Sequence, residues 1–276
     1  RLYWEDVTLK FIDINASDFN NKTSFSLASF HAYRLTESVT LNTNFFFTFD
    51  GLFVVFDGQG HTITISGVSG FNGLFQNGTS TTNGHALITI KNLGVLSSNG
   101  SALAQNAGWI GRSWFGKGAI SNKIENCYSD GAISASYAGG ICGSYAGKDG
   151  GILEVTNCYS MGPISAGAAG GICGTETGYL GGTVTVTNCY SAGALTAGGN
   201  GIFGHIASSK TSVTSPNCYI ANGSWSDKAS DGAFIAGCVQ HLATTMESIN
   251  TPTTIYVDYN RGLNNVPHAL FWQTDY

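Results

Sequence analysis

The chain has 276 residues and a formal net charge of −5, and only 11% of its residues are charged, against roughly 25% in a typical soluble protein. Nucleic-acid binding needs clustered Lys and Arg, so this composition excludes a nucleic-acid partner. No run of about 18 apolar residues occurs, and the sequence therefore predicts no membrane span. The 38 glycines are typical of an all-β architecture rich in turns.

Residues 1–49 carry short alternating apolar runs, of which Val7 to Ile12 is an example. Alternation with a period of two predicts β-strands. The open end of a stacked β architecture exposes unpaired edges unless it is capped, so we expect residues 1–49 to form an N-terminal cap. Residues 45–56 are strongly apolar and are expected to be buried strands, with contact to lipid or to a partner as the alternative.

A sequence repeat occupies residues 123–204. Cys127, Cys158 and Cys189 follow one another at intervals of 31 residues (158−127 and 189−158). A fixed period of this length indicates a repeat architecture in which each unit packs only against its neighbours. We therefore expect a single repeat domain over residues 50–223.

Each period contains three short apolar runs that are separated by turn residues. In the second copy these runs are 152–155, 158–164 and 170–173. Short runs that are rich in β-branched residues and bounded by Gly and Asn predict strands. Three strands at a constant period predict a parallel β-solenoid, in which each strand pairs with its counterpart one period later. Phe53 to Gly223 would make about six coils, or a rod about 30 Å long at about 4.8 Å per stacked strand.

Asn, Cys and Tyr recur in this order at the same bend of each period. Asn tolerates the left-handed backbone of a sharp bend, and stacked amide side chains can hydrogen-bond along a column. Because Cys and Tyr have opposite parity along a strand, we expect the Cys inside as a small apolar filler and the Tyr outside. The three columns are Asn126, Asn157, Asn188 and Asn217; Cys127, Cys158, Cys189 and Cys218; and Tyr128, Tyr159, Tyr190 and Tyr219.

The seven cysteines contain no close C-x₂-C pair. Structural zinc sites use such pairs, so the sequence predicts no metal, and nothing in it indicates another cofactor. Neighbouring cysteines of a column would lie within reach of a disulfide, but side chains on in-register strands point in parallel, which opposes the required torsion. We therefore expect buried free thiols that pack as small hydrophobes, with disulfides along the column as the alternative.

These repeats, with NCYS followed by GGICG, resemble the GLUG-type repeats of bacterial surface proteins and of proteins of large DNA viruses. The upstream run FDGQGHTITI at residues 56–65, followed by Gly73-Leu74-Phe75, looks like the first rung common in such chains. The resemblance covers roughly residues 50–223. It implies an all-β fold, a right-handed parallel β-helix similar to pectin-lyase-like proteins, and it implies an architecture rather than a reaction.

Many pectin-lyase-like β-helices degrade polysaccharides, so catalysis has to be weighed. Glycoside hydrolysis takes two carboxyl groups that face the scissile bond. Glu125 and Glu154 do not share a column, because they are 29 residues apart (154−125) rather than 31. His61 and His205 are isolated, whereas a catalytic base needs a placed partner. We predict no catalytic residues, and a polysaccharide lyase or glycoside hydrolase is the alternative.

The repeat ends near residue 223, and residues 224–276 have a different composition. They include Trp225 and Trp272 and several tyrosines. We expect a C-terminal cap that covers the last coil. A docking tail for another chain is the alternative, since aromatic residues are enriched at protein interfaces.

Together these features predict a non-catalytic structural or adhesive protein at the surface of a virus particle, as a minor capsid or spike component, or of a cell. The resemblance to proteins of large DNA viruses favours the virion. An exposed tyrosine column would form a flat aromatic strip that suits sugar rings or a partner surface, whereas simple stacking within the sheet is the alternative. The expected partners are other capsid or surface proteins, glycans, and further copies of the chain in a homo-oligomer.

Overall fold

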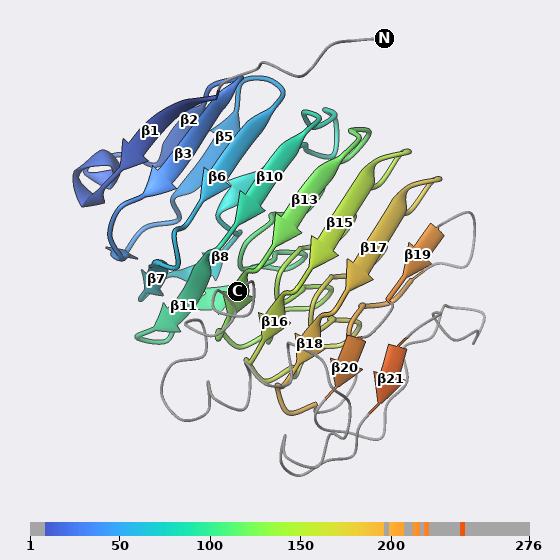
Figure 1. Ribbon diagram of the computed structural model, residues 1–276. Coiled ribbons are helices and arrows are strands. Elements are labelled where there is room, and N and C mark those ends of the chain that lie inside the picture. The colour runs from blue at the N-terminus through green and yellow to red at the C-terminus, as the bar shows by residue number, and fades with distance from the viewer. Residues whose placement is uncertain (1–8, 196–198, 207–211, 216–217, 221–237, 241–276) are drawn as a thin grey trace, which may run out of the picture.

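The structure, a computed structural model, describes residues 9–195, 199–206, 212–215, 218–220 and 238–240. Within these ranges the regular structure is almost entirely β-strand, and the strand pairings are parallel. Figure 1 shows strands from distant parts of the chain side by side, from β1 to β19. The chain is therefore all-β, as the sequence predicts.

Two long sheets contain eight strands each. In order of pairing, sheet I consists of β1 (Lys10–Ile14), β3 (His31–Leu35), β6 (Val54–Asp57), β10 (Ile88–Lys91), β13 (Asn122–Glu125), β15 (Ile152–Thr156), β17 (Thr183–Thr187) and β19 (Ser212–Thr214). Sheet II consists of β4 (Val39–Leu41), β7 (Thr62–Ser66), β11 (Gly94–Ser98), β14 (Tyr128–Ser129), β16 (Tyr159–Ser160), β18 (Tyr190–Ser191), β20 (Cys218–Ile220) and β21 (Cys238–Gln240).

Two small sheets and one short 3₁₀ helix complete the regular structure of the described residues. Sheet III consists of β2 (Ser24–Leu27), β5 (Phe46–Phe49) and β9 (Phe75–Gln76), and the fourth sheet pairs β8 (Ser69–Phe71) with β12 (Ala102–Leu103). The 3₁₀ helix η1 (Ala16–Phe19) begins after Asn15, whose side chain accepts a hydrogen bond from the backbone N–H of Ser17. An asparagine at this position satisfies a backbone donor that the helix itself leaves unpaired.

The chain alternates between the two long sheets. After a strand of sheet I it bends, adds a short strand to sheet II and returns to sheet I; we call the segment from one sheet I strand to the next a layer. In the regular layers the return path pairs through isolated parallel bridges, such as Ile133 with Ile164 and Cys142 with Cys173. The third apolar run of each period therefore forms bridges rather than the full strand that the sequence predicts.

Equivalent residues of successive layers lie over one another. In sheet I, Val155 pairs with Ile124 in the preceding layer and with Val186 in the next, and in sheet II Tyr128 pairs with Tyr159. The 31-residue period is thus one layer in this part of the chain. The predicted pairing of each strand with its counterpart one period later is confirmed.

The segment expected to be a cap, residues 1–49, extends the same sheets over its described part. β1 and β3 join sheet I, β4 joins sheet II, and β2 and β5 join sheet III. The other six strands of sheet I come from residues 50–223, which equals the number of coils expected there. The boundary at residue 50 is therefore not visible in the strand pairing.

The phenylalanine-rich run at residues 45–56 contributes an aromatic part of the core. Phe45, Phe47 and Phe56 are buried, and the ring centroid of Phe47 lies 5.2 Å from that of Phe45 and 4.9 Å from that of Phe56. Such aromatic pairs stabilise a core by about 0.5–1.5 kcal/mol beyond the burial of their area. Burial of these three rings agrees with the expectation of buried strands.

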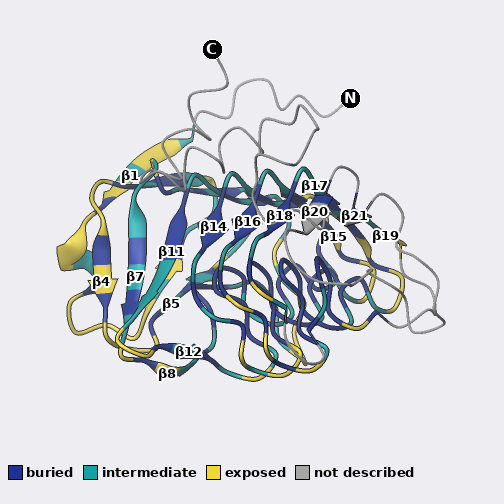
Figure 2. Cartoon of the chain, turned by 90° about the horizontal axis from the view of Figure 1, so that it is seen from below, coloured by how far each residue is buried: buried dark blue, intermediate teal, exposed yellow. Residues whose placement is uncertain are grey.

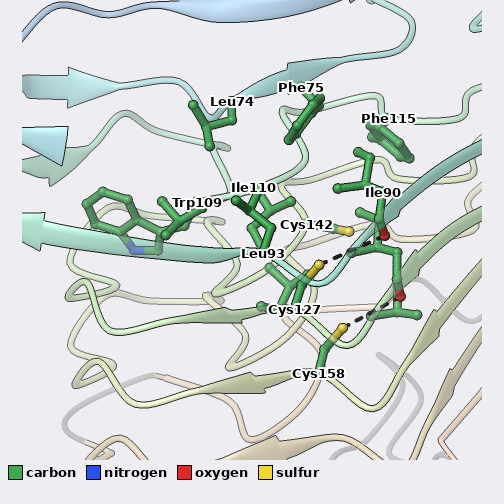
Figure 3. Close-up of a cluster of buried hydrophobic side chains, with 14 of the residues drawn as sticks. Leu74, Phe75, Ile90, Leu93, Trp109, Ile110, Phe115, Cys127, Cys142 and Cys158 are labelled. Carbon is green, nitrogen blue, oxygen red and sulfur yellow. Dashed lines mark hydrogen bonds between the residues drawn. The ribbon is translucent and has the colours of Figure 1, made fainter. Parts of the chain in front are cut away.

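A continuous hydrophobic core lies between the sheets, and Figure 3 shows the part around Ile110 and Phe115. Both residues are fully buried. Burying one such side chain contributes about 1.5–3 kcal/mol, so packing between layers stabilises the stack. Figure 2 shows the same distribution over the whole molecule, with buried residues along the strands and most exposed residues at turns and at the β1 end.

The cysteine columns lie within this core. Cys127, Cys142, Cys158, Cys173 and Cys189 are buried free thiols, and Cys218 is buried with its Sγ donating to the carbonyl oxygen of Val186 at 3.2 Å. Figure 3 shows the Sγ atoms of Cys127 and Cys158 directed at backbone carbonyl oxygens of sheet I. Burial raises the pKa of the Cys127 and Cys189 thiols. Protonated thiols in such surroundings are inert.

An asparagine ladder occupies the bend between the two long sheets. Asn126, Asn157 and Asn188 have left-handed φ values of 54°, 54° and 52°. The Nδ2 of Asn157 donates to Oδ1 of Asn126 at 3.1 Å, and Nδ2 of Asn188 donates to Oδ1 of Asn157 at 3.2 Å. Asn126 in turn donates to Asn92 at 3.2 Å, so the ladder begins one layer before the cysteine column. The remaining predicted member, Asn217, lies outside the described residues.

Glycines allow the layers to approach closely on the return path. A Cβ atom on Gly140 would overlap the carbonyl oxygen of Gly171 and would lie 2.7 Å from the Cβ of Ser160. Since Gly140 does not have a positive φ, the position needs glycine for space rather than for backbone freedom.

Residues 224–276, expected to form a cap or a docking tail, lie outside the described residues except for β21, which pairs with β20. The described part of the chain contains no helix with the length and apolar character needed to cross a membrane. Nor do three or more His, Cys, Asp or Glu side chains of these described ranges gather in a metal-binding arrangement.

Candidate functional site

The tyrosine column of sheet II is buried. Tyr128, Tyr159 and Tyr190 are 3%, 1% and 1% exposed, so their predicted exposure is wrong. The rings of Tyr128 and Tyr159 stack with centroids 5.0 Å apart and planes 8° apart, and the ring of Tyr128 occupies the space that the missing side chain of Gly94 leaves. In-register stacking covers the faces of each ring, which strand parity alone does not reveal. The side chain of Tyr219 lies outside the described residues, and binding of glycans by this column stays a prediction.

A second column of side chains lies at the turns of the return path. Trp114, Tyr145 and Glu176 follow one another at intervals of 31 residues (145−114 and 176−145) and have left-handed φ values of 71°, 62° and 56°. This backbone conformation is uncommon for such side chains and recurs at functional sites. The backbone N–H groups of Trp114 and Tyr145 donate to the carbonyl oxygens of Ser144 and Thr175, both at 2.9 Å. These hydrogen bonds hold each turn against the next.

Stacking and a lysine fix the orientation of the Trp114 ring. Trp114 and Tyr145 are half-buried, and their ring centroids lie 4.2 Å apart with 11° between the planes. The Nζ of Lys148 lies 4.7 Å from the Trp114 centroid and 5.3 Å from the centroids of Tyr145 and Tyr179. Each cation–π contact at an exposed site contributes about 0.5–1 kcal/mol.

The opposite face of the Trp114 ring borders a pocket of about 220 Å³, which we call the Trp114 pocket. Tyr145 covers Trp114 from the following layer, whereas most of the pocket wall comes from the preceding layer, so the two lie on opposite sides of the ring. The lining residues are Asn72, Gln76, Gly78, Thr79, Ser80, Arg112, Ser113 and Trp114. This volume is below the roughly 300–1,000 Å³ typical of pockets for drug-sized ligands, and it suits a single sugar ring.

Buried polar contacts hold the loop that forms one wall of the pocket. Lys117 is buried, and its Nζ donates to the carbonyl oxygen of Ser80 at 3.1 Å and lies 3.4 Å from Oδ2 of Asp149. Asn77 bonds to both backbone groups of His85, through Nδ2 at 2.9 Å and Oδ1 at 2.6 Å. A wall that is already ordered reduces the entropic cost of binding a ligand.

Two acidic side chains considered for catalysis make structural contacts instead. Glu154 forms an exposed ion pair with Lys123 at 2.9 Å, and Asp130 accepts a hydrogen bond from the backbone N–H of Ser97 at 2.7 Å. Burial raises the pKa of both Asp130 and Glu176. Glu154 lies on β15 and Glu176 in a turn of the return path, so the structure does not place them as a pair across one groove.

Trp114 and Arg112 are not among the residues that the sequence singles out. The signal that points to Trp114 is its spacing of 31 residues from Tyr145, the same interval that separates the cysteines. Gln76 lies outside this regular period, because it precedes its hydrogen-bond partner Arg112 by 36 residues. The pocket therefore joins a regular layer to an irregular one, and only the structure brings its two walls together.

Comparison with known proteins finds no family model that matches the chain and no curated protein that matches it. Among solved structures, the chain is similar to a crystal structure described as "a putative immunoglobulin A1 protease from Bacteroides ovatus". The two chains are 19% identical with a TM-score of 0.45, and the alignment covers 93% of this chain and 89% of that chain. A likeness at this level carries no argument about function.

Proposed function

We propose that the chain is a right-handed parallel β-helix related to GLUG-type repeat proteins, with a non-catalytic adhesive role at the surface of a virus particle or a cell. The order of the strands supports the β-helix, because in both long sheets each strand pairs with a strand of the next layer. Crossover connections between parallel strands are right-handed in nearly all known cases. A hydrogen-bonded stack of layers forms a stiff scaffold, which suits a minor capsid or spike component or a surface adhesin.

The adhesive contact that we propose is a glycan in the Trp114 pocket. A tryptophan face offers an apolar surface for the C–H face of a sugar ring. The amide of Asn72 and the hydroxyls of Thr79 and Ser113 supply donors and acceptors for sugar hydroxyls. The observation that carries this proposal is the Trp114 ring, held by Tyr145 on one face and bordering a polar pocket on the other.

The chemistry of the pocket favours binding over catalysis. Its eight lining residues offer an aromatic ring, amides, hydroxyls and a guanidinium group, but no carboxyl group, whereas glycoside hydrolysis takes two. A polysaccharide-degrading activity therefore stays the alternative. Other capsid or surface proteins and further copies of the chain are the protein partners that this role implies.

The test is binding of the full chain to an array of neutral and acidic oligosaccharides, with a Trp114→Ala variant alongside. Tyr137→Ala is the matched control, because Tyr137 is an exposed aromatic residue at another turn with a left-handed φ of 66°. We expect the control to bind like the wild type and Trp114→Ala to bind about tenfold more weakly or worse, which corresponds to a loss of about 1.4 kcal/mol or more. A wild-type chain that binds no glycan, or a Trp114→Ala variant that binds normally, would overturn the proposal.

A further inference from the structure

Arg112 lines the Trp114 pocket with a guanidinium group that two neighbours hold in place. Its Cζ lies 4.2 Å from the centroid of the Phe46 ring, and its Nη1 donates to Oε1 of Gln76 at 3.0 Å. A guanidinium group has five N–H donors, of which Gln76 occupies one among the described residues. The group is therefore fixed in orientation and keeps further donors for a ligand.

No carboxylate of the described part of the chain forms an ion pair with Arg112. The ion pairs found there join Arg34 to Asp13, Lys91 to Asp57, Lys117 to Asp149 and Lys123 to Glu154. Arg112 is half-buried, and this burial lowers its pKa because it removes the cation from water. A partly desolvated cation that lines a pocket favours a ligand with a negative charge.

We propose that the Trp114 pocket selects an acidic sugar, whose carboxylate pairs with Arg112 while its ring packs on Trp114. This inference rests on the proposed glycan binding and adds the class of sugar to it. The planar fork of a guanidinium group matches a carboxylate through two parallel N–H···O bonds. Because Gln76 occupies only one donor of Arg112, the remaining N–H groups are enough for such a pair. Asn72 and Ser113 are then left for the sugar hydroxyls.

Two classes of sugar carry a carboxylate on the ring, the uronic acids and the sialic acids. In both, the carboxylate is bonded directly to a ring carbon, so the same placement of Trp114 and Arg112 serves either. The probes are therefore trigalacturonate and sialyllactose. Methyl-esterified trigalacturonate and lactose are their neutral counterparts, and the comparison of the two acids identifies the source of the carboxylate.

Isothermal titration calorimetry of the full chain with these four sugars measures the selectivity. We expect at least one acid to bind about 10- to 100-fold more tightly than its neutral counterpart, the range for a hydrogen bond to a charged group. The preference should shrink as salt is added. Arg112→Gln should abolish it and Arg112→Lys restore part of it, since lysine keeps the charge but not the fork. Arg34→Gln, which removes an exposed cation of β3, is the control and should leave it unchanged.

Equal affinity for the acidic and neutral sugars, with binding still lost in Trp114→Ala, would overturn the role of Arg112 and leave the proposed function standing. Failure of all four probes would overturn the acidic-sugar inference, and the glycan array then decides the proposed function separately. A thermal melt shows whether Arg112→Gln folds. If it does not fold, the wild-type comparison of each acid with its neutral counterpart still decides the question.

Discussion

Trp114 and Tyr145 stack face to face across two successive layers, with their ring centroids 4.2 Å apart and their planes 11° apart. Each residue has a left-handed backbone, so the turn holds the side chain away from the strands. Tyr145 thereby supports the ring that borders the pocket without lining the pocket itself. This arrangement separates a residue that contacts the ligand from one that positions it.

Replacing Tyr145 by Ala should weaken sugar binding even though Tyr145 does not line the pocket. An aromatic pair contributes about 0.5–1.5 kcal/mol, so we expect the affinity of the Trp114 pocket to fall by a factor of roughly 2 to 10. Titration calorimetry with a glycan bound by the wild type measures this effect. Tyr145→Phe keeps the ring and is the control; equal losses in both variants, or no loss in Tyr145→Ala, would contradict the supporting role.

Gly140 should be far less tolerant of a side chain than Gly167. A Cβ on Gly140 would overlap the carbonyl oxygen of Gly171, while a Cβ on Gly167 meets no atom within 4 Å. We expect Gly140→Ala to lower the free energy of unfolding by about 1–3 kcal/mol or more. Gly167→Ala should raise it by up to about 1 kcal/mol, because alanine restricts the unfolded chain. Urea unfolding of both variants measures the difference, and equal effects would show that the layers are not as close at Gly140 as described.

The asparagine ladder predicts an order of stability for variants of its central member. Asn157 combines a φ of 54° with hydrogen bonds to Asn126 and Asn188. Asn157→Gly keeps the backbone conformation and loses hydrogen bonds of about 0.5–1.5 kcal/mol each. Asn157→Ala loses the same bonds and adds about 1–2 kcal/mol for a left-handed residue with a Cβ. Thermal melts should therefore rank wild type above Gly and Gly above Ala; a glycine variant less stable than the alanine variant would refute this account.

The constant period allows the sequence to predict the parallel pairing and its register. Val155 lies between Ile124 and Val186 because a stack of equal layers places residues 31 apart over one another. The same logic cannot predict burial of Tyr159, since parity gives the direction of a side chain but not what covers it. Nor does the period reach residues 10–49, whose irregular spacing hides that β1 and β3 continue sheet I.

The candidate site escapes the sequence for a related reason. Arg112 and Trp114 come from a layer of the regular stack, but Gln76 and Thr79 come from an irregular layer before it. Their contact spans 36 residues in one case, which no constant period predicts. Trp114 could have been found from its spacing to Tyr145, whereas the positions of Arg112 and Gln76 required the structure.

Ionisation of the buried tyrosine column should limit stability at high pH. Burial raises the pKa of Tyr128 above its ordinary value of 10.0, and the charge of Asp130 adds to the effect. Above pH 10 the unfolded chain releases this proton while the folded chain retains it, so stability is complete below pH 10 and falls as the pH rises toward the folded pKa. Thermal melts of the wild type should therefore shift to lower temperature above pH 10. The shift should be smaller in Tyr128→Phe, while Tyr137→Phe, which removes a hydroxyl from an exposed turn, is the control; equal slopes in the two variants would contradict burial of Tyr128.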